Sequence, residues 1–331
     1  MKSSIKIALD VMGGDYAPLE VIKGAILAQK EMKDISLVLV GDKFSIEKYL
    51  KRLGDTQFLI KDAPEVIRME DPPALSIRKK KNSSIVEGIN LLKSGEVQGF
   101  VSAGNTGAVV CASTLYLGLL EGIQRPGIGI LLPTLKGMSF MIDVGANIDP
   151  KPFHLLQYAI MGDAYFRIVW GKKRPKIGLL NIGEEETKGT DFLKECYNLL
   201  SQSELNFLGN IEAKDIFSGK CDVIICDGFV GNIALKVSEG LAETLTKFLK
   251  QFFKKNIVCY MGAFLIRPFL KDFFRSIDYA EYGGAPLLGI KGTVIICHGR
   301  SKAKAIKNAI KVARSQILSK LNKNIIELIN A

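Results

Sequence analysis

Residues 101–110 read VSAGNTGAVV and lie near the middle of a long stretch, 97–120, that contains no charged side chain. Taken whole, the stretch has the apolarity of a membrane span. The polar, glycine-rich pentapeptide AGNTG (103–107) would then lie at the centre of the bilayer, where such backbone is poorly tolerated. The better interpretation is a buried strand over 97–103, a turn, and a buried helix over 106–120. A strand followed directly by a helix is the repeating unit of an α/β fold.

Other apolar runs repeat this arrangement along the chain. Several are apolar without interruption, as expected for strands covered on both faces, and helix-length segments separate many of them. The pattern predicts a three-layer α/β/α fold around a mainly parallel sheet, in a single domain over 1–331. The predicted strands lie at 5–11, 35–41, 57–62, 99–103, 127–133, 138–145, 175–183, 205–210, 221–228 and 292–299.

A polar residue or a glycine follows the last apolar position of many of these strands. In open α/β sheets, ligands gather at the carboxyl ends of the strands. We therefore expect the polar residues to converge on one edge of the sheet and to form the binding site there. They are Asp10, Ser102, Asp143, Asn181, Asp227 and His298.

Composition narrows the class of protein. With 331 residues, 47% of them hydrophobic, the chain can bury a large core. The first residues lack an apolar signal stretch and the six cysteines show no C-x-x-C spacing, which favours a cytoplasmic protein with reduced thiols. The net charge of +11 favours an acidic partner, such as nucleic acid, an anionic membrane surface or an acidic protein.

The AGNTG turn has two interpretations that the residues alone leave open. Either it serves only backbone geometry, or it is an anion cradle. In a cradle, Gly104 and Gly107 let the backbone approach a ligand, and the first N–H groups of the helix point at it. Asn105 and Thr106 would then add side-chain donors. The G-x-G-x-x-G and G-x-x-x-x-G-K-[ST] nucleotide fingerprints are absent.

Several segments together resemble the bacterial phosphate acyltransferase family of phospholipid synthesis. The resemblance covers nearly the whole chain, in the family's order. It implies an enzyme without a cofactor that transfers a fatty acyl group from acyl–acyl carrier protein to inorganic phosphate. It also implies a fold similar to those of phosphotransacetylases and of isocitrate and isopropylmalate dehydrogenases. The segments are ALDVMGGDYAP (8–18), RKKKNSS (78–84), VSAGNTGA (101–108), DVGANIDPKP (143–152), GLLNIGEEETKGTD (178–191), NFLGNIE (206–212), CDGFVGNIALK (226–236) and YGGAPLLG (282–289).

Two positions depart from the family pattern. Val11 stands where the family usually has alanine, a change that we expect to be silent. Arg300 stands where the family pattern HGSS has serine, which puts in doubt any hydroxyl contact at that position. The departure leaves His298 and Gly299 unchanged.

The resemblance implies site residues as well. Lys188 lies in the loop NIGEEETKGTD (181–191), where an ammonium would neutralise phosphate and stabilise the developing oxyanion. From the residues alone this loop is equally an exposed acidic turn, and the aspartates after strands are equally helix caps or loop acceptors. The predicted catalytic residues are Lys188, Asn105, Asp143 and Asn232. The predicted residues that bind phosphate or the acyl carrier are Asp10, Gly13, Gly14, Ser102, Gly104, Thr106, Gly107, Asn147, Glu185, Asp227 and His298.

The chemistry of the transfer needs no enzyme nucleophile. Attack of phosphate on a thioester requires an anion site, a polarised carbonyl, alignment and exclusion of water. The chain has two histidines and no G-x-S-x-G elbow, which favours direct transfer over an acyl-enzyme. We expect His154 to be structural, because it lies at a helix start. Asp10 and Asp15 flank two glycines, but two carboxylates specify no metal, and we predict none.

The segment SIRKKKNSS (76–84) carries four consecutive basic residues, Arg78, Lys79, Lys80 and Lys81. Such a run is often only a solvated surface. Here it is also a candidate docking surface for the acidic carrier protein, because charge aids encounter and register. The run lacks the aromatic residues typical of nucleic-acid binding, and we predict no nucleic-acid partner.

Residues 240–280 form a second unusual region, which we predict to be a projecting amphipathic helical hairpin. One helix face is apolar and the opposite face carries lysines, and a second helix is predicted to open at Pro268. Such a face either packs in the core or against a second copy of the chain, or inserts shallowly into an anionic membrane. The resemblance implies a homodimer and peripheral association with the inner face of the cell membrane. The predicted membrane contacts are Phe248, Phe252, Phe253, Phe264, Phe269 and Phe273.

Three other functions compete with this interpretation. A phosphotransacetylase-like enzyme would use acyl-coenzyme A as donor, whereas the Phe-rich region argues for long acyl chains. A non-catalytic membrane scaffold would have no need of the predicted catalytic residues. A nicotinamide dehydrogenase on the same general fold is disfavoured by the absent dinucleotide fingerprint.

Overall fold

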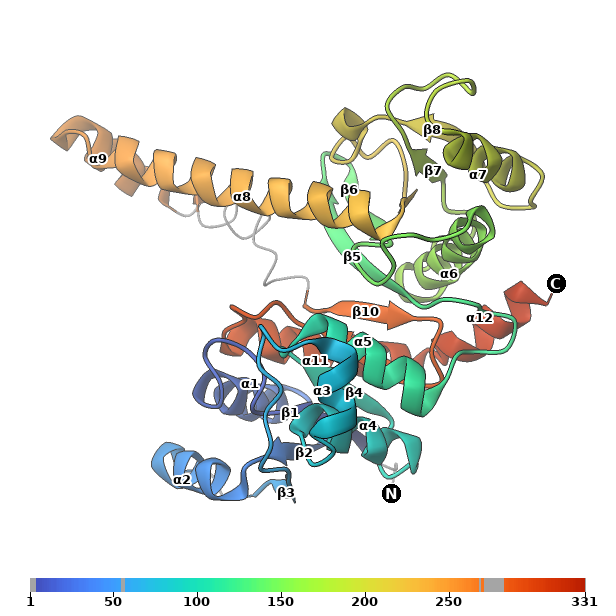
Figure 1. Ribbon diagram of the computed structural model, residues 1–331. Helices are drawn as coiled ribbons and strands as arrows, with labels where there is room; N and C mark the ends of the chain where they lie inside the picture. Colours follow the sequence, from blue (N-terminus) through green and yellow to red (C-terminus); the bar gives the residue numbers. More distant parts are fainter. Residues whose placement is uncertain (1–3, 55–56, 268, 271–282, 331) are drawn as a thin grey trace.

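The computed structural model describes residues 4–54, 57–267, 269–270 and 283–330. The described strands pair into one 11-stranded sheet in the order β3-β2-β1-β4-β11-β10-β5-β6-β9-β7-β8. Most neighbouring pairs are parallel, and helices pack on both faces (Figure 1). The predicted α/β class with a mainly parallel sheet is confirmed.

Strands and helices alternate along most of the chain. The strands are β1 (Ile5–Asp10), β2 (Ile35–Gly41), β3 (Leu59–Asp62), β4 (Gly99–Ser102), β5 (Gly127–Thr134), β6 (Gly137–Ile142), β7 (Ile177–Leu180), β8 (Phe207–Ile211), β9 (Val223–Ile225), β10 (Ala285–Leu288) and β11 (Thr293–Ile296). The helices are α1 (Leu19–Glu31), α2 (Lys43–Leu53), α3 (Pro73–Lys79), α4 (Ser84–Lys93), α5 (Thr106–Ala112), α6 (Pro152–Trp170), α7 (Asp191–Ser201), α8 (Gly228–Phe253), α9 (Ile257–Leu265), α11 (Ala303–Leu318) and α12 (Leu321–Ile329). A π-helical turn (Ser113–Leu117) and a 3₁₀ turn (Ala213–Asp215) complete the described elements.

The sheet consists of two parallel blocks that run in opposite directions. The first block is β3, β2, β1, β4 and β11, and the second block is β6, β9, β7 and β8. The antiparallel pairs β11–β10, β10–β5 and β5–β6 join them. The carboxyl ends of the strands therefore fall into two groups. The expectation that all the polar residues after strands share one sheet edge is corrected accordingly.

The first block is covered by different helices on its two faces. Alternation along β1 sends Ile7 and Leu9 to one face, where they join the buried residues of α1 and α11. Ala8 and Phe100 face the other way and join the buried residues of α4 and α5. A strand buried on both faces needs apolar residues at nearly every position, as the sequence of β1 has.

The second block has its own core beneath α6 and α7. Phe140 of β6 stacks on Tyr165 of α6, with ring centroids 4.2 Å apart. The C-terminal helix α12 follows α11 of the first block but packs on α6, burying Leu321 and Ile325 there (Figure 1). The corner between α11 and α12 is Lys320, which has a left-handed φ of 52°. The end of the chain thus ties the two blocks together.

Helix α8 begins directly after β9 and runs for 26 residues, a length of about 39 Å at 1.5 Å per residue. Together with the described residues 254–267 and 269–270 that follow it, α8 forms a segment that we call the arm. Figure 1 shows it extending away from the sheet, with α9 at its far end. Among the described residues, no helix is both long and apolar enough to cross a membrane.

Three local expectations need correction. The strand β10 was not predicted, because Gly283, Gly284 and Pro286 in its vicinity indicate a turn rather than a strand. The helix predicted over 106–120 is shorter and changes to a π turn at Ser113. The connecting segment of the predicted hairpin is itself helical, as α9, while Pro268 and Phe273 lie outside the described residues.

Candidate active site

The turn after β4 is held by a buried hydrogen-bond chain that starts at Asp10. Ser102 Oγ donates to Asp10 Oδ2 at 2.6 Å and accepts from the Gly104 N–H at 3.0 Å. Ser84, at the start of α4, hydrogen-bonds the same carboxyl, and so does the Met12 N–H. Burial raises the pKa of Asp10, while these hydrogen bonds oppose the rise. Asp10 thus fixes the ends of β1 and β4 relative to each other.

Asn105 uses its whole side chain within the protein. Its Oδ1 accepts from the Ala108 N–H at 3.0 Å and caps α5. Its Nδ2 donates to the carbonyl oxygens of Arg68, Met69 and Asp71 at distances of 3.1, 3.0 and 3.1 Å. These contacts make Asn105 a positioning residue for the loop that precedes α3.

The glycines of this region are required by close packing of the backbone. A Cβ at Gly13 would overlap Asp10 Oδ2 and the Gly104 nitrogen, and one at Gly107 would overlap the ring of Pro73. The N–H groups of Thr106 and Gly107 find no acceptor within the described chain. These two backbone N–H groups are therefore available to donate hydrogen bonds to a bound anion.

Asp143 organises the loop after β6. Its carboxylate accepts from four backbone N–H groups, those of Ile128, Gly145, Ala146 and Asn147, at 2.8 to 3.1 Å. The side chain is 0% exposed, and burial raises its pKa against the lowering effect of these bonds. Asp143 therefore holds the loop rather than a ligand.

The neighbouring Asn147 is also committed to the protein. Its Nδ2 donates to the Pro126 carbonyl at 2.6 Å and to the Tyr158 hydroxyl at 2.7 Å. Its own carbonyl accepts from the Gly228 N–H at 2.9 Å, at the start of α8. The loop after β6 and the arm therefore begin as one hydrogen-bonded unit.

Helix α8 begins with a cap and then presents an amide. Asp227 Oδ1 accepts from the N–H groups of Phe229 and Val230 at 3.0 and 2.9 Å. Asn232 is exposed, and a Cβ built at Gly145 would lie 3.7 Å from its side-chain carbon. The amide of Asn232 makes no hydrogen bond within the described chain, so it is available to a ligand.

The loop after β7 is anchored through its backbone. Asn181 Nδ2 donates to the Lys188 carbonyl at 3.2 Å, and Asn210 Nδ2 donates to the Glu185 carbonyl at 2.9 Å. Both amides are buried, and both leave the side chains of the loop pointing outward. Thr190 caps the next helix, since its Oγ1 accepts from the Leu193 N–H.

Two of the three glutamates in this loop also have partners. Glu184 pairs with Lys220 at 2.9 Å, and Glu186 accepts from the Tyr197 hydroxyl at 2.7 Å. Lys188 is exposed, and its ammonium makes no ion pair with any described residue. A fixed loop that carries one unneutralised cation is suited to bind an anion.

The two blocks meet through side chains along α8. His298 Nε2 lies 3.8 Å from Glu239 Oε2, and Arg300 Nη1 lies 3.4 Å from Glu243 Oε1. His298 and Arg300 follow β11 of the first block, whereas α8 follows β9 of the second. Glu239 lies about 18 Å along the helix from Asp227, at 1.5 Å per residue. α8 thus bridges the two groups of strand ends, and the candidate site extends along it.

The predicted docking and membrane residues lie outside this centre. Lys80 donates to Asp71 at 2.6 Å and to the Val66 carbonyl at 2.8 Å, so it holds the loop beneath Asn105. The other basic residues of the run, Arg78, Lys79 and Lys81, are exposed without an ion pair in the described chain. On the arm, Phe253 is half-buried, and the exposed phenyl groups are Phe248, Phe252, Phe264 and Phe269.

Sequence reasoning missed three residues that the structure brings to the site. Ser84 ends a basic segment of the sequence, and no local pattern links it to Asp10. Lys236 and Glu239 lie four and seven residues after Asn232, a spacing that places all three on one helix face. That spacing, and the place of Lys236 at the end of the segment 226–236, were the available signals.

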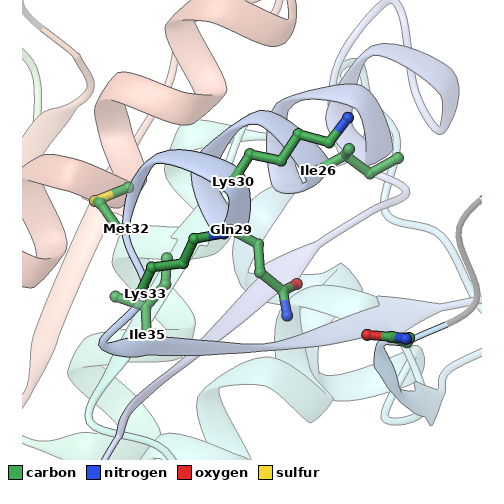
Figure 2. Close-up of a pocket in the computed structure, with 7 residues that line it drawn as sticks. Ile26, Gln29, Lys30, Met32, Lys33 and Ile35 are labelled. Atoms are coloured by element: carbon green, nitrogen blue, oxygen red, sulfur yellow. The ribbon is translucent and has the colours of Figure 1, made fainter.

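One surface hollow lies away from this region. Its volume is about 250 Å³, and it opens at the amino end of β2, opposite to the end that carries polar loops (Figure 2). It is lined by Ile26, Gln29, Lys30, Met32, Lys33, Ile35 and Gln57. In the described part of the chain, no group of three histidine, cysteine or carboxylate side chains lies close enough together to hold a metal ion.

Comparisons with known proteins decide the family. Residues 5–324 match the model of a family described as fatty acid synthesis protein. The phosphate acyltransferase of Dictyoglomus turgidum is 51% identical over 98% of this chain and 98% of its own. This chain belongs to the phosphate acyltransferase family. The family's counterpart in Aquifex aeolicus is 47% identical over 97% of this chain and 96% of its own. The protein is therefore an acyltransferase enzyme of lipid synthesis.

Solved structures show the same fold at low sequence identity. A phosphotransacetylase from Streptococcus pyogenes superposes with a TM-score of 0.67 at 17% identity, covering 95% of this chain and 94% of that one. A branched-chain phosphotransacylase from Enterococcus faecalis gives a TM-score of 0.58 at 13% identity, covering 95% and 99%. These likenesses confirm the predicted phosphotransacetylase-like fold of this phosphate acyltransferase.

Proposed function

We propose that this enzyme transfers a long-chain fatty acyl group from acyl–acyl carrier protein to inorganic phosphate, giving acyl phosphate for phospholipid synthesis. A phosphate oxygen attacks the thioester carbonyl, and the carbon–sulfur bond breaks. The proton of HPO₄²⁻ ends on the departing sulfur, so that atoms and charge balance. The observation that carries the proposal is Lys188, an exposed cation without an ion pair in the described chain, on an anchored loop at a strand end. An ammonium there stabilises both the phosphate and the oxyanion.

The state of the thiols supports direct attack by phosphate. Cys226 and Cys297 follow strands β9 and β11, at the carboxyl ends where ligands of such sheets gather. Both are buried, and burial raises the pKa of Cys297 to about 12 and that of Cys226 well above its usual value. A buried neutral thiol is a poor nucleophile. The phosphate itself is then the group that captures the acyl chain.

The basic surface beside the turn is the proposed docking surface for the acidic carrier protein. Arg78, Lys79 and Lys81 are exposed, and the backbone beneath them is fixed by Asn105 and Lys80. Charges at the rim of an interface mainly raise the association rate and are screened by salt. Binding of carrier to the protein is therefore expected to weaken as salt rises.

The central experiment compares donors and acceptors directly. Purified protein is incubated with palmitoyl-loaded carrier, with and without orthophosphate, and acyl phosphate is trapped with hydroxylamine. The proposal expects hydroxamate only when phosphate is present. Palmitoyl-coenzyme A in a parallel reaction tests the alternative donor. Thioester loss without phosphate, or radiolabelled acyl groups retained on the protein, would contradict direct transfer.

The far end of the arm is the proposed contact with an anionic membrane. Phe252, Phe264 and Phe269 are 58%, 65% and 76% exposed, and Lys250 and Lys254 lie nearby on the same arm. Apolar rings next to lysines suit shallow insertion between anionic head groups. Contact there would bring the apolar product to the membrane in which it is used.

Vesicle sedimentation tests this contact. Phe252→Glu combined with Phe264→Glu is expected to abolish sedimentation with phosphatidylglycerol vesicles. Phe44→Glu is the matched control, because Phe44 is likewise exposed, at 76%, but lies on α2. Equal sedimentation of the double variant and the control would remove the membrane assignment.

The near half of the arm is the proposed interface of a homodimer. Val230, Ile233, Val237 and Leu241 form one apolar stripe of α8 at helical spacing, and each is more than 40% exposed. In a dimer with two-fold symmetry, the stripe of one copy would pack against the same stripe of the second copy. Light scattering is expected to give a dimer, and Val237→Glu a monomer. A monomeric wild-type protein would contradict the interface.

A further inference from the structure

The polar face of α8 carries charged residues that the proposed reaction has not yet used. Asn232, Lys236 and Glu239 share one face because they lie at i, i+4 and i+7. That face is turned toward the first block, since Glu239 lies next to His298. The apolar stripe of α8 lies on the other side of the helix. On the polar face, side chains of α8 therefore lie next to a side chain of the first block.

A single carboxylate oxygen lies between two donors from different blocks. Lys236 Nζ donates to Glu239 Oε2 at 2.8 Å, and His298 Nε2 lies 3.8 Å from the same oxygen. The Glu239 side chain is 17% exposed, whereas those of Lys236 and His298 are 51% and 29% exposed. The more buried partner is thus the anion, and solvent reaches the donors around it.

The proton of the imidazole is placed by the backbone. The Arg300 N–H donates to His298 Nδ1 at 3.1 Å, so in the neutral ring the proton lies on Nε2, toward Glu239. Burial lowers the pKa of His298, and the charges of Lys236 and Arg300 lower it further, against Glu239 and Asp15. At neutral pH an imidazole N–H and an ammonium therefore face one carboxylate oxygen.

We propose that Lys236 and His298 bind the attacking phosphate, and that the Glu239 carboxylate, which accepts from Lys236 and lies 3.8 Å from His298 Nε2, holds this place until a phosphate oxygen replaces it. The inference rests on the proposed function, in which phosphate is the acceptor. It adds Lys236 of α8 and assigns a role to His298 after β11, in a site that already includes Asn232 of α8 and the strand-end loops. Asn232 lies one turn before Lys236 and beside Gly145, so the bound phosphate would lie between Lys236 and the amide.

The exchange is physically easy. An exposed lysine that pairs with a carboxylate three residues away on the same helix gains little from the contact, so displacing the carboxylate costs little. Phosphate brings two negative charges and several acceptor oxygens, and it can accept from both donors at once. Glu239 meanwhile keeps the Lys236 ammonium in place when no phosphate is bound. Its carboxylate also raises the phosphate concentration needed for binding.

Proton NMR of the two histidines tests the site without an activity measurement. The chain contains only His154 and His298, and His154→Gln assigns the two imidazole signals. Saturating orthophosphate next to His298 is expected to raise the pKa of that imidazole and to leave His154 unchanged. In the Lys236→Gln protein the phosphate-dependent shift should require at least tenfold more phosphate. Phosphate that stabilises the protein against heat without moving the His298 signal would overturn the proposal.

Steady-state kinetics give a second, independent readout. Lys236→Gln is expected to raise KM for phosphate by about tenfold or more, as loss of a charge-assisted hydrogen bond does, and to leave KM for the acyl carrier unchanged. Glu239→Gln is expected to lower KM for phosphate, since the competing charge is gone. Lys247→Ala, an exposed lysine of the same helix, is the control and should change neither. An unchanged KM for phosphate in Lys236→Gln would reject the assignment.

The two proposals can fail separately. If acyl phosphate forms normally but Lys236→Gln has wild-type KM, the reaction stands and the phosphate lies elsewhere. If orthophosphate shifts His298 but no acyl phosphate is ever trapped, the binding site stands and the proposed reaction is wrong. Circular dichroism melts of Lys236→Gln and Glu239→Gln at equal protein concentration show whether each variant is folded.

Discussion

The turn after β4 and the loop after β7 follow strands of the same kind, short and fully buried, yet they use their polar residues in opposite ways. In the turn, Ser102 and Asn105 are buried and bonded to the protein. In the loop, the backbone is anchored from below and Lys188 remains exposed without an ion pair in the described chain. A buried polar residue after a strand therefore serves the protein, whereas an exposed residue without a partner in the described chain is available to a ligand. Burial and existing partners distinguish the two.

The sharpest test of this difference is Lys188→Ala. Loss of a group that stabilises the oxyanion is expected to lower kcat by about 10² to 10³. The free energy of unfolding should change by less than about 0.5 kcal/mol, because the side chain is exposed and makes no ion pair with any described residue. Phosphate-dependent thioester loss and urea denaturation measure the two quantities.

A nearby lysine provides the control for that variant. Lys194 lies on α7 and pairs with Asp191 at 3.1 Å, so Lys194→Ala should keep its activity. An undiminished rate in Lys188→Ala would show that Lys188 does not act on the substrates, so that the loop after β7, like the turn after β4, has only a structural role.

The turn is tested by Asn105→Ala, with the opposite expectation. Removing the cap and the three donor contacts leaves backbone groups unsatisfied and should cost about 2 to 3 kcal/mol of stability. Urea denaturation checks this against Asn90→Ala, a change at an exposed position of α4 that should be nearly neutral. A stable Asn105→Ala protein that has lost only activity would move Asn105 from positioning to catalysis.

The adjacent residues Lys80 and Lys79 allow the same comparison, because Lys80 is bonded to the protein whereas Lys79 is exposed. Lys80→Ala breaks bonds to Asp71 and to the Val66 carbonyl, so it should lower the melting temperature, though less than Asn105→Ala. Lys79→Ala should leave stability unchanged and slow association with the carrier at low salt. Stopped-flow association and thermal melts separate the two effects. Equal melts for both variants would show that the loop does not depend on Lys80.

The smallest expected effect is a pH dependence of stability from the buried polar network. Burial lowers the pKa of His154, and the charges of Arg125 and Lys151 add to this. The unfolded chain then takes up the proton first, so the contribution of His154 falls as pH drops below its unfolded pKa of about 6.5. His154→Gln should show a shallower loss between pH 7 and pH 5 in urea denaturation. An identical pH slope would mean that His154 titrates alike in both states.

The sequence predicted the strands well and their directions poorly. Each of the ten predicted strands is found within a few residues, because a strand buried on both faces must be apolar almost throughout. The reversal between the blocks was invisible, because apolarity is the same for either direction. Strand β10, which creates the reversal together with β5, was missed because its residues indicate a turn.

The site divides in the same way. Lys188, Asp227 and Asn232 were predicted from motifs after strands and stay predictions as site residues, and the loop role of Asp143 was one of two interpretations that the residues allowed. Ser84 and Glu239 could not be assigned, because each contacts a residue far away in the chain. Lys236 could not be assigned either, because its contact with Glu239 is a local pair of the kind found on many helices. Lys80 could not be told apart from its neighbours in a run of four basic residues.

The sequence by itself determined the α/β class, the positions of nearly all the strands, the family and the existence of polar loops after strands. Those properties depend on local apolarity and on short motifs, which are written residue by residue. Only the tertiary structure decided which polar side chains are consumed inside the protein, where the two blocks face each other, and that α8 bridges them. Hydrogen-bond partners and counter-charges are set by distances in space between residues that lie far apart along the chain.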